Sequence, residues 1–167
     1  MKLHQVFKAS LYEPKKLAAF RLLSIGKVFQ YTFGFVTLFT LISFIRFTVG
    51  DAVLFEASPE LMEYSQSIGG LVYPIAFIFQ LVISTFYIFV RICLFAYIGV
   101  LLLKMMKRRD DYRFIWRTSA ISMTVPILLT FFFDFFPLIK PYSLVLTSIV
   151  HIAYIAAAAR YYPKTAR

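Results

Sequence analysis

Four long stretches of nearly unbroken apolar residues, separated by short polar segments, dominate the pattern of this chain. They cover residues 28–49, 71–103, 118–136 and 142–162. A helix needs about 20 apolar residues to cross the hydrocarbon core of a bilayer, and each stretch comes close to or exceeds that length. The pattern predicts an all-α integral membrane protein with four transmembrane helices, forming a single membrane domain over residues 1–167.

The second stretch is longer than a bilayer requires. As a helix it would measure about 50 Å, against a hydrocarbon core of about 30 Å. We therefore expect this helix to tilt, to lie at the membrane surface before Pro74, or to project into the cytoplasm.

The N-terminal segment 3–21 mixes apolar and basic residues. Leu3, Val6 and Leu11 follow helical spacing, which predicts an amphipathic interfacial helix. Pro14 is expected to break this helix and to start a new first turn. The segment suits either an anchor on the membrane surface or a docking surface for a partner protein.

The distribution of charge predicts the orientation. The net charge is +10, and fifteen of the eighteen Lys and Arg residues lie in 1–27, 104–117 and 160–167. The segment 50–70 carries four acidic residues and no basic one. By the positive-inside rule, 104–117 is a cytoplasmic loop, 50–70 an extracytoplasmic loop, and both termini are cytoplasmic. The basic side predicts contact with anionic lipid. No basic and aromatic module stands outside the spans, so nucleic acid is not an expected partner.

Four ionisable side chains fall within or near the spans, where such groups are costly and often functional. They are Arg46, Arg91, Asp134 and His151. Arg46 and Asp134 both belong to the outer third of their spans, so an ion pair between the first and third spans is predicted. Arg91 and His151 both lie near mid-depth and can share a polar pocket.

The fourth span carries hydroxyls and an imidazole on one face, because Ser143, Thr147 and His151 recur every four residues. Hydrogen bonding between helices is the favoured interpretation, and a site for a ligand, proton or lipid headgroup is the alternative. A catalytic histidine is least favoured, since no carboxylate or nucleophile is placed to act with it. Metal, cofactor and nucleotide motifs are absent from the sequence, and the single cysteine, Cys93, allows no internal disulfide. We expect no enzyme, no metal and no cofactor.

Two stretches resemble one family of membrane proteins. The first holds Phe7, Lys8, Ser10, Leu11, Tyr12, Pro14, Lys15, Phe20, Arg21, Ile25, Gly26 and Lys27, and the second holds Tyr112, Arg113, Trp116, Ser119, Ala120 and Pro126. Both are similar to stretches of the YvdJ-like family, a domain-of-unknown-function family often labelled maltodextrin utilisation protein. The resemblance implies a multi-pass protein of a Gram-positive bacterial plasma membrane, linked by label to sugar uptake. It implies no reaction.

Three functions are compatible with these observations. The first is a non-enzymatic accessory subunit that binds another integral membrane protein, with an ABC-type sugar transporter as a candidate. The second is a small oligomeric transporter or channel-like protein with a polar path through Arg91 and His151, and the third is a lipid-binding membrane module. The residues expected to form a cytoplasmic docking surface are Tyr12, Pro14, Lys15, Arg21, Tyr112, Arg113 and Trp116.

Overall fold

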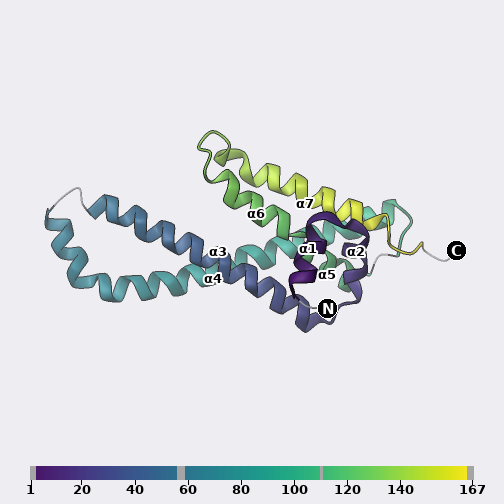
Figure 1. The fold of residues 1–167 in the computed structure, drawn as a ribbon, viewed down its shortest axis with the longest axis horizontal. Coiled ribbons are helices and arrows are strands. Elements are labelled where there is room, and N and C mark those ends of the chain that lie inside the picture. Colours follow the sequence, from purple (N-terminus) through teal and green to yellow (C-terminus); the bar gives the residue numbers. More distant parts are fainter. Residues whose placement is uncertain (1–2, 56–58, 110, 165–167) are drawn as a thin grey trace. The chain divides into compact units, whose positions relative to one another are not determined.

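The computed structural model describes residues 3–55, 59–109 and 111–164, and every element in this part of the chain is a helix. The helices are α1 (Leu3–Tyr12), α2 (Pro14–Ala19), η1 (Phe20–Leu22), α3 (Ile25–Phe55), α4 (Pro59–Met105), α5 (Tyr112–Ser122), α6 (Thr124–Phe133), η2 (Lys140–Tyr142) and α7 (Ser143–Ala159) (Figure 1). Four stretches are long and apolar enough to cross a membrane: Ile25–Val49, Tyr73–Met105, Tyr112–Phe133 and Lys140–Ala159. The all-helical fold and four candidate spans agree with the prediction.

The predicted loop at 50–70 is largely helical backbone. Residues 50–55 complete α3, residues 59–70 open α4, and residues 56–58 lie outside the described part. The second predicted span, 71–103, is therefore the C-terminal part of one 47-residue helix that passes through Pro74 without ending. Glycine costs only about 1 kcal/mol in a helix, so α4 can continue through the pair Gly69 and Gly70.

The third span begins earlier than its apolar pattern indicated. Asp111 caps α5: its carboxylate accepts a hydrogen bond from the Arg113 backbone N–H at 3.0 Å. A capped N-terminus satisfies one of the helix's orphan donors, so the helix starts at Tyr112 and takes in the second half of the predicted loop 104–117. The fourth predicted span, 142–162, corresponds to η2 followed by α7.

The third predicted span, 118–136, breaks in its middle near Pro126, and this break has a simple cause. Pro126 has no N–H to donate to Ser122, four residues earlier, and α5 ends at Ser122. The chain restarts as α6 at Thr124. The Thr124 hydroxyl donates to the carbonyl of Ile121 at 2.7 Å, and the Ser122 hydroxyl donates to that of Ser119 at 3.0 Å. Both hydroxyls thus add hydrogen bonds to backbone carbonyls in the last turn of α5.

The chain divides into two compact units. Unit 1 comprises residues 1–32 and 90–167, and unit 2 comprises residues 33–89. Both α3 and α4 continue from one unit into the other, so each unit holds a part of both helices.

Unit 2 is an antiparallel pair of helices joined by aromatic contacts. The rings of Phe33 and Phe89 lie 5.7 Å apart, and an edge-to-face contact of 5.1 Å joins Phe44 to Phe77. In this unit, residues near the start of the α3 part thus meet residues near the end of the α4 part. Such pairs add about 0.5–1.5 kcal/mol each beyond the area they bury.

The core of unit 1 is formed by the start of α3, the end of α4 and the helices that lie wholly within the unit. The N-terminal segment lies against it: α1 contacts α5 and α6, and α2 contacts α5 and α7. The sequence predicted that the apolar face of α1 would carry Leu3, Val6 and Leu11. Val6 is buried as predicted, but Leu11 is only half-buried and Leu3 is exposed, while Ala9 and Ser10 are buried. The protein-facing side of α1 is partly polar because it meets hydroxyl groups, as described below.

Gly99 allows α4 to lie close to α5 and α7. A Cβ atom at Gly99 would lie 2.6 Å from Cγ1 of Ile115 and 3.1 Å from Cγ2 of Ile155. Both isoleucine side chains are fully buried. Small residues at such crossings let membrane helices pack by close van der Waals contact.

Candidate functional site

The interior of unit 1 contains a buried polar cluster built from three helices. Arg91 comes from α4, Ser119 from α5, and Thr147 and His151 from α7. Their exposed fractions are 5% for Arg91 and 0% for the other three. These residues form two hydrogen-bonded pairs, Arg91 with Thr147 and His151 with Ser119, at the meeting point of the helices.

The guanidinium of Arg91 is held by a hydroxyl. Its Nη2 donates to Oγ1 of Thr147 at 2.9 Å, and this hydroxyl donates in turn to the carbonyl of Ser143 at 2.7 Å. Each bond polarises the next, which strengthens a hydrogen bond in a medium of low dielectric constant. Thr147 therefore links Arg91 to the backbone of α7 through two consecutive hydrogen bonds.

His151 is oriented by the backbone of α5. Its Nε2 lies 3.1 Å from the carbonyl oxygen of Ser119, which can only accept, so Nε2 carries the hydrogen. The Ser119 hydroxyl donates to the carbonyl of Ile92 on α4 at 3.1 Å. His151 Nδ1 is buried and has no hydrogen-bond partner among the described residues.

An aromatic ring completes the cluster. Phe95 lies with its ring centroid 4.4 Å from that of His151, and the Arg91 guanidinium carbon lies 5.6 Å from the same ring. The face of a phenyl ring attracts a cation, and this contributes about 0.5–2 kcal/mol depending on desolvation. Phe95 separates the cation from the imidazole and contacts both.

The structure thus brings together three residues that the sequence singled out: Arg91, Thr147 and His151. Phe95 and the backbone of Ser119 were not recognised as part of this cluster, although Ser119 belongs to the second family-like stretch. Arg46 lies in unit 2 and Asp134, the C-cap of α6, in unit 1. The predicted ion pair between these two residues stays a prediction.

A second group of hydroxyls fastens the N-terminal helices. The hydroxyl of Tyr31 on α3 lies 2.6 Å from that of Thr124 on α6 and 3.4 Å from that of Ser10 on α1. The hydroxyl of Tyr154 on α7 donates to the carbonyl of Leu11 at 2.9 Å. All of these groups lie in unit 1, and Ser10, Tyr31 and Thr124 are buried. The N-terminal segment is therefore an integral part of unit 1.

The residues predicted to form a docking surface divide into exposed and structural ones. Tyr12 is 79% exposed, and Lys15, Tyr112 and Arg113 are also exposed. Pro14 opens α2, as predicted. Arg21, by contrast, is structural, as are its neighbours around Tyr162.

Tyr162 is the centre of that structural group. The guanidinium carbon of Arg21 lies 4.9 Å from the Tyr162 ring, and the Tyr162 hydroxyl lies 2.6 Å from that of Thr118. Arg117 donates to the carbonyl of Arg21 at 3.0 Å. Burial raises the pKa of Tyr162 to about 12, against the lowering effects of Thr118 and Arg21. Tyr162 therefore stays neutral at physiological pH.

The loop between α4 and α5 is tied to the C-terminal residues. Lys107 adopts a left-handed conformation, with φ of 54°, and the Arg108 N–H bonds back to the carbonyl of Leu103 at 2.9 Å, as in a Schellman cap. The Arg108 side chain then donates to the carbonyl of Tyr162 at 2.6 Å, and the Arg109 N–H donates to that of Pro163 at 3.0 Å.

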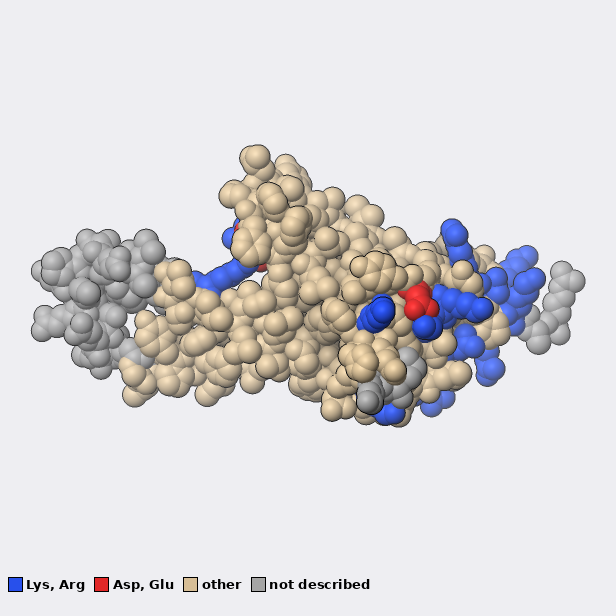
Figure 2. All heavy atoms as spheres, in the orientation of Figure 1, with Lys and Arg blue, Asp and Glu red and all other residues tan. Residues whose placement is uncertain are grey.

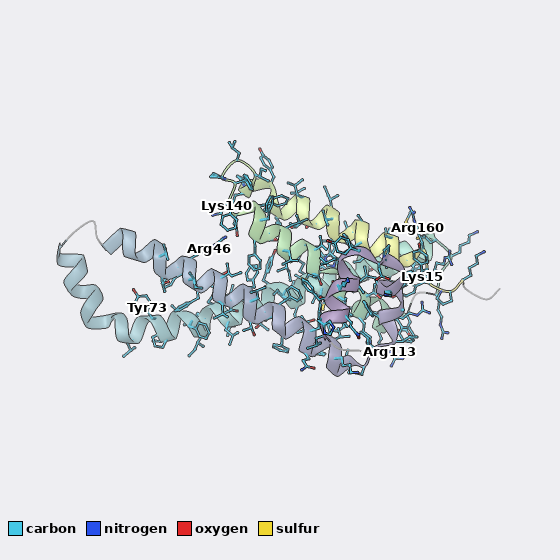
Figure 3. The ribbon with its side chains drawn as sticks, in the orientation of Figure 1. Lys15, Arg46, Tyr73, Arg113, Lys140 and Arg160 are labelled. Atoms are coloured by element: carbon cyan, nitrogen blue, oxygen red, sulfur yellow. The ribbon has the colours of Figure 1, made fainter. Side chains whose placement is uncertain are left out.

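Basic side chains gather at one end of unit 1. Figure 2 shows Lys and Arg concentrated over the N-terminal helices and the chain's C-terminal end. In Figure 3, Lys15, Arg113 and Arg160 lie toward this end, whereas Lys140 lies at the opposite end of α7. Three segments distant in sequence thus share one basic surface of unit 1, while their predicted position on the cytoplasmic side of a membrane stays a prediction.

The described residues of unit 1 form at least two concave surfaces. The N-terminal hollow, with a volume of about 810 Å³, is formed by α1, α2 and the turn after them, and its lining residues are His4, Gln5, Lys8, Ala9, Glu13, Lys16, Ala19, Phe20, Leu22 and Leu23. The Trp116 groove, of about 450 Å³, is lined by Ile25, Phe29, Tyr112, Arg113, Trp116 and Arg117. Neither hollow nor groove was apparent from the sequence, because each combines residues from separate elements. Within the described ranges, no three His, Cys, Asp or Glu side chains cluster as metal ligands would.

These features define a class: an all-helical chain with four helices of membrane-spanning length and composition, and a polar cluster enclosed in its interior. The chain belongs to the family described as "Protein of unknown function (DUF1189)", whose model matches residues 56–159. The match covers α4 to α7, including the second family-like stretch at Tyr112–Pro126. Among curated proteins and solved structures, none matches the chain. The predicted membership of a family of unknown function is confirmed, while the maltodextrin label stays a prediction.

Proposed function

We propose that this protein is a non-enzymatic accessory subunit that binds another integral membrane protein and assists or regulates it. The observation that carries the proposal is the N-terminal hollow. Its most buried lining residues, Ala9 and Phe20, are apolar, and its polar lining includes Lys8 and the Glu13–Lys16 ion pair of 2.9 Å. An apolar centre within a polar rim is the common arrangement of protein-binding surfaces.

The attachment of the hollow supports the same function. The helices that form it are fixed by the hydroxyl contacts of Tyr31 and Tyr154, and Leu17 and Ala18 are buried on their inner side. A surface that is already ordered loses little conformational entropy on binding. Tyr12 and Lys15 are exposed at the junction of α1 and α2 and suit contacts at the margin of such an interface.

The site of action that we infer is the cytoplasmic side of a bacterial plasma membrane, with both termini inside. The basic end of unit 1 supports this orientation, because basic loops stay on the cytoplasmic side during insertion. The family-like stretches, with their maltodextrin label, make an ABC-type sugar transporter the candidate partner. The basic end would favour an acidic cytoplasmic surface on that partner.

Purification of the tagged full-length protein in mild detergent tests this function. We expect one membrane protein or complex to co-purify in a fixed ratio. Ala19→Tyr should abolish that association, because Ala19 is exposed within the N-terminal hollow and a tyrosine would fill part of it. Ala153→Tyr is the matched control: Ala153 is also exposed, but lies on α7 and does not line the hollow. Migration of the wild-type protein alone, with no crosslinked partner, would contradict the proposal.

A second candidate function is a small oligomeric transporter, favoured by the buried Arg91 and His151 within the spans. His151 Nδ1, which has no hydrogen-bond partner among the described residues, offers an acceptor for a proton or ligand. Flux measurements in proteoliposomes distinguish the two functions. Transport that Arg91→Ala and His151→Ala both abolish would favour this candidate, and no flux, or flux that neither variant changes, would count against it.

A further inference from the structure

The Trp116 groove lies where two candidate spans begin. Ile25 is the first residue of one span and Tyr112 the first residue of another, and both line the groove. The start of a span marks the level at which hydrocarbon gives way to lipid headgroups. Trp and Tyr favour this level because their rings are amphipathic. The groove therefore has one end among acyl chains and the other among headgroups.

The walls of the groove are apolar and ordered. The rings of Phe29 on α3 and Trp116 on α5 lie 5.5 Å apart, and the Trp116 indole N–H donates to the sulfur of Cys93 on α4 at 3.4 Å. Trp116 is thereby held by contacts to two other helices. Together with Ile25, these rings form a surface suited to a hydrocarbon chain.

Two arginines stand in the same groove. The side chain of Arg113 is 85% exposed, and its Nε lies 3.8 Å from the Asp111 carboxylate, beyond hydrogen-bonding distance. Arg117 donates one N–H to the carbonyl of Arg21, and its Nε is buried without a hydrogen-bond partner among the described residues. The Arg117 side chain is half-buried and lines the groove, so its guanidinium N–H groups other than Nε can donate to a phosphate oxygen.

We propose that the Trp116 groove binds one anionic phospholipid. The acyl chain lies along Ile25, Phe29 and Trp116, and the phosphate accepts hydrogen bonds from Arg113 and Arg117. The N-terminus of α3 adds positive potential at the same place, whereas the N-terminus of α5 is already capped by the Asp111 carboxylate. This site is distinct from the N-terminal hollow, so it stands independently of the accessory function.

Tryptophan fluorescence tests the site directly, because Trp116 is the only tryptophan of the chain. The full-length protein is reconstituted into phosphatidylcholine vesicles containing a fifth of phosphatidylglycerol, with bromine on the acyl chains of one lipid or the other. Brominated phosphatidylglycerol should quench Trp116 several-fold more strongly per molecule than brominated phosphatidylcholine. Arg113→Gln should reduce this preference by about fivefold, the factor expected for one basic residue near anionic lipid. Arg113→Lys should retain most of the preference.

The control is Arg160→Gln, which removes an exposed charge from the same basic end but does not line the groove. An effect equal to that of Arg113→Gln would show a diffuse electrostatic attraction and overturn the proposal. Equal quenching by both lipids in the wild-type protein would also overturn it, as would no quenching, which would mean that protein covers the groove. Inorganic phosphate, compared with sodium chloride at equal ionic strength, should leave the preference unchanged; its loss with phosphate alone would indicate a site for free phosphate instead of lipid.

Discussion

Replacement of Gly99 by alanine should destabilise unit 1, although alanine is the better helix former. The new Cβ would lie 2.6 Å from Cγ1 of Ile115, a distance that requires the buried Ile115 side chain or one of the two helices to shift. Overpacking of a buried contact costs about 1–3 kcal/mol, and relief from glycine's flexibility returns about 0.5–1 kcal/mol. The middle of each range gives an expected net loss of about 1 kcal/mol in the free energy of unfolding.

The assay is unfolding in mixed micelles of a mild detergent and sodium dodecyl sulfate, followed by the fluorescence of Trp116. Gly26→Ala is the matched control. Gly26 is also helical and in unit 1, and no described atom lies within 4 Å of a Cβ built there. This variant should be as stable as the wild-type protein or slightly more stable.

A double variant makes the reasoning refutable. Ile115→Ala alone should cost about 2–5 kcal/mol, because it leaves a cavity. Ile115→Ala also removes the atom that opposes the new Cβ. The loss in the free energy of unfolding of the double variant, Gly99→Ala with Ile115→Ala, should therefore be smaller than the sum of the two single losses by about 1 kcal/mol or more. A neutral Gly99→Ala, or two strictly additive losses, would show that the helices do not approach as closely as described.

Three further predictions concern the polar contacts of unit 1. Thr147→Val removes a hydroxyl that accepts a hydrogen bond from Arg91, and it should cost about 1–3 kcal/mol in the same unfolding assay. Thr130→Val removes a hydroxyl bonded within its own helix and should cost less than about 1 kcal/mol. Equal losses would contradict this prediction. Tyr31→Phe should loosen α1, seen as faster hydrogen exchange over residues 3–12, while Tyr12→Phe at the exposed junction should leave exchange unchanged. Burial favours the neutral form of Tyr162 in the folded protein. Between pH 10 and pH 12 the folded state therefore keeps a proton that the unfolded state releases. The free energy of unfolding should fall by about 2–3 kcal/mol over this range. Tyr162→Phe should remove this part of the decline, and Tyr161→Phe, at the exposed neighbour, should not; an absorbance titration showing Tyr162 ionised near pH 10 would contradict the prediction.

The fold class was predictable because a bilayer imposes a strong requirement on sequence. Each span must satisfy its own backbone and present apolar side chains, so 28–49 and 142–162 are readable as helices without reference to any other part of the chain. The break at Pro14 and the kink near Pro126 were predictable for a similar local reason, since proline cannot donate an N–H.

The features missed by the sequence depend on contacts between segments. The polar inner face of α1 follows from Tyr31, which lies 21 residues after Ser10, and from Thr124, which lies 93 residues after Tyr31. Neither residue leaves a signal in the local pattern of residues 3–12. The capping role of Asp111 carried a local signal, an aspartate just before a periodic stretch, but the charge of the loop masked it. The N-terminal hollow and the Trp116 groove arise only once separate helices are in place.

Arg91, Thr147 and His151 lie between these cases. Their depth and spacing indicated a shared environment, because residues four apart fall on one helix face. Which side chains face them is decided by the packing of α4 against α5 and α7, and this packing depends on Gly99 and the small residues near it. Phe95 could not be recognised for this reason.

The central claim is that the N-terminal hollow binds another membrane protein, and crosslinking in living cells tests it most directly. A photoreactive amino acid placed at position 19 reports on the hollow, and one placed at position 153 reports on an exposed face of α7. We predict a discrete adduct with one integral membrane protein from position 19 that is absent from position 153. No adduct at position 19, or the same set of adducts from both positions, would contradict the account.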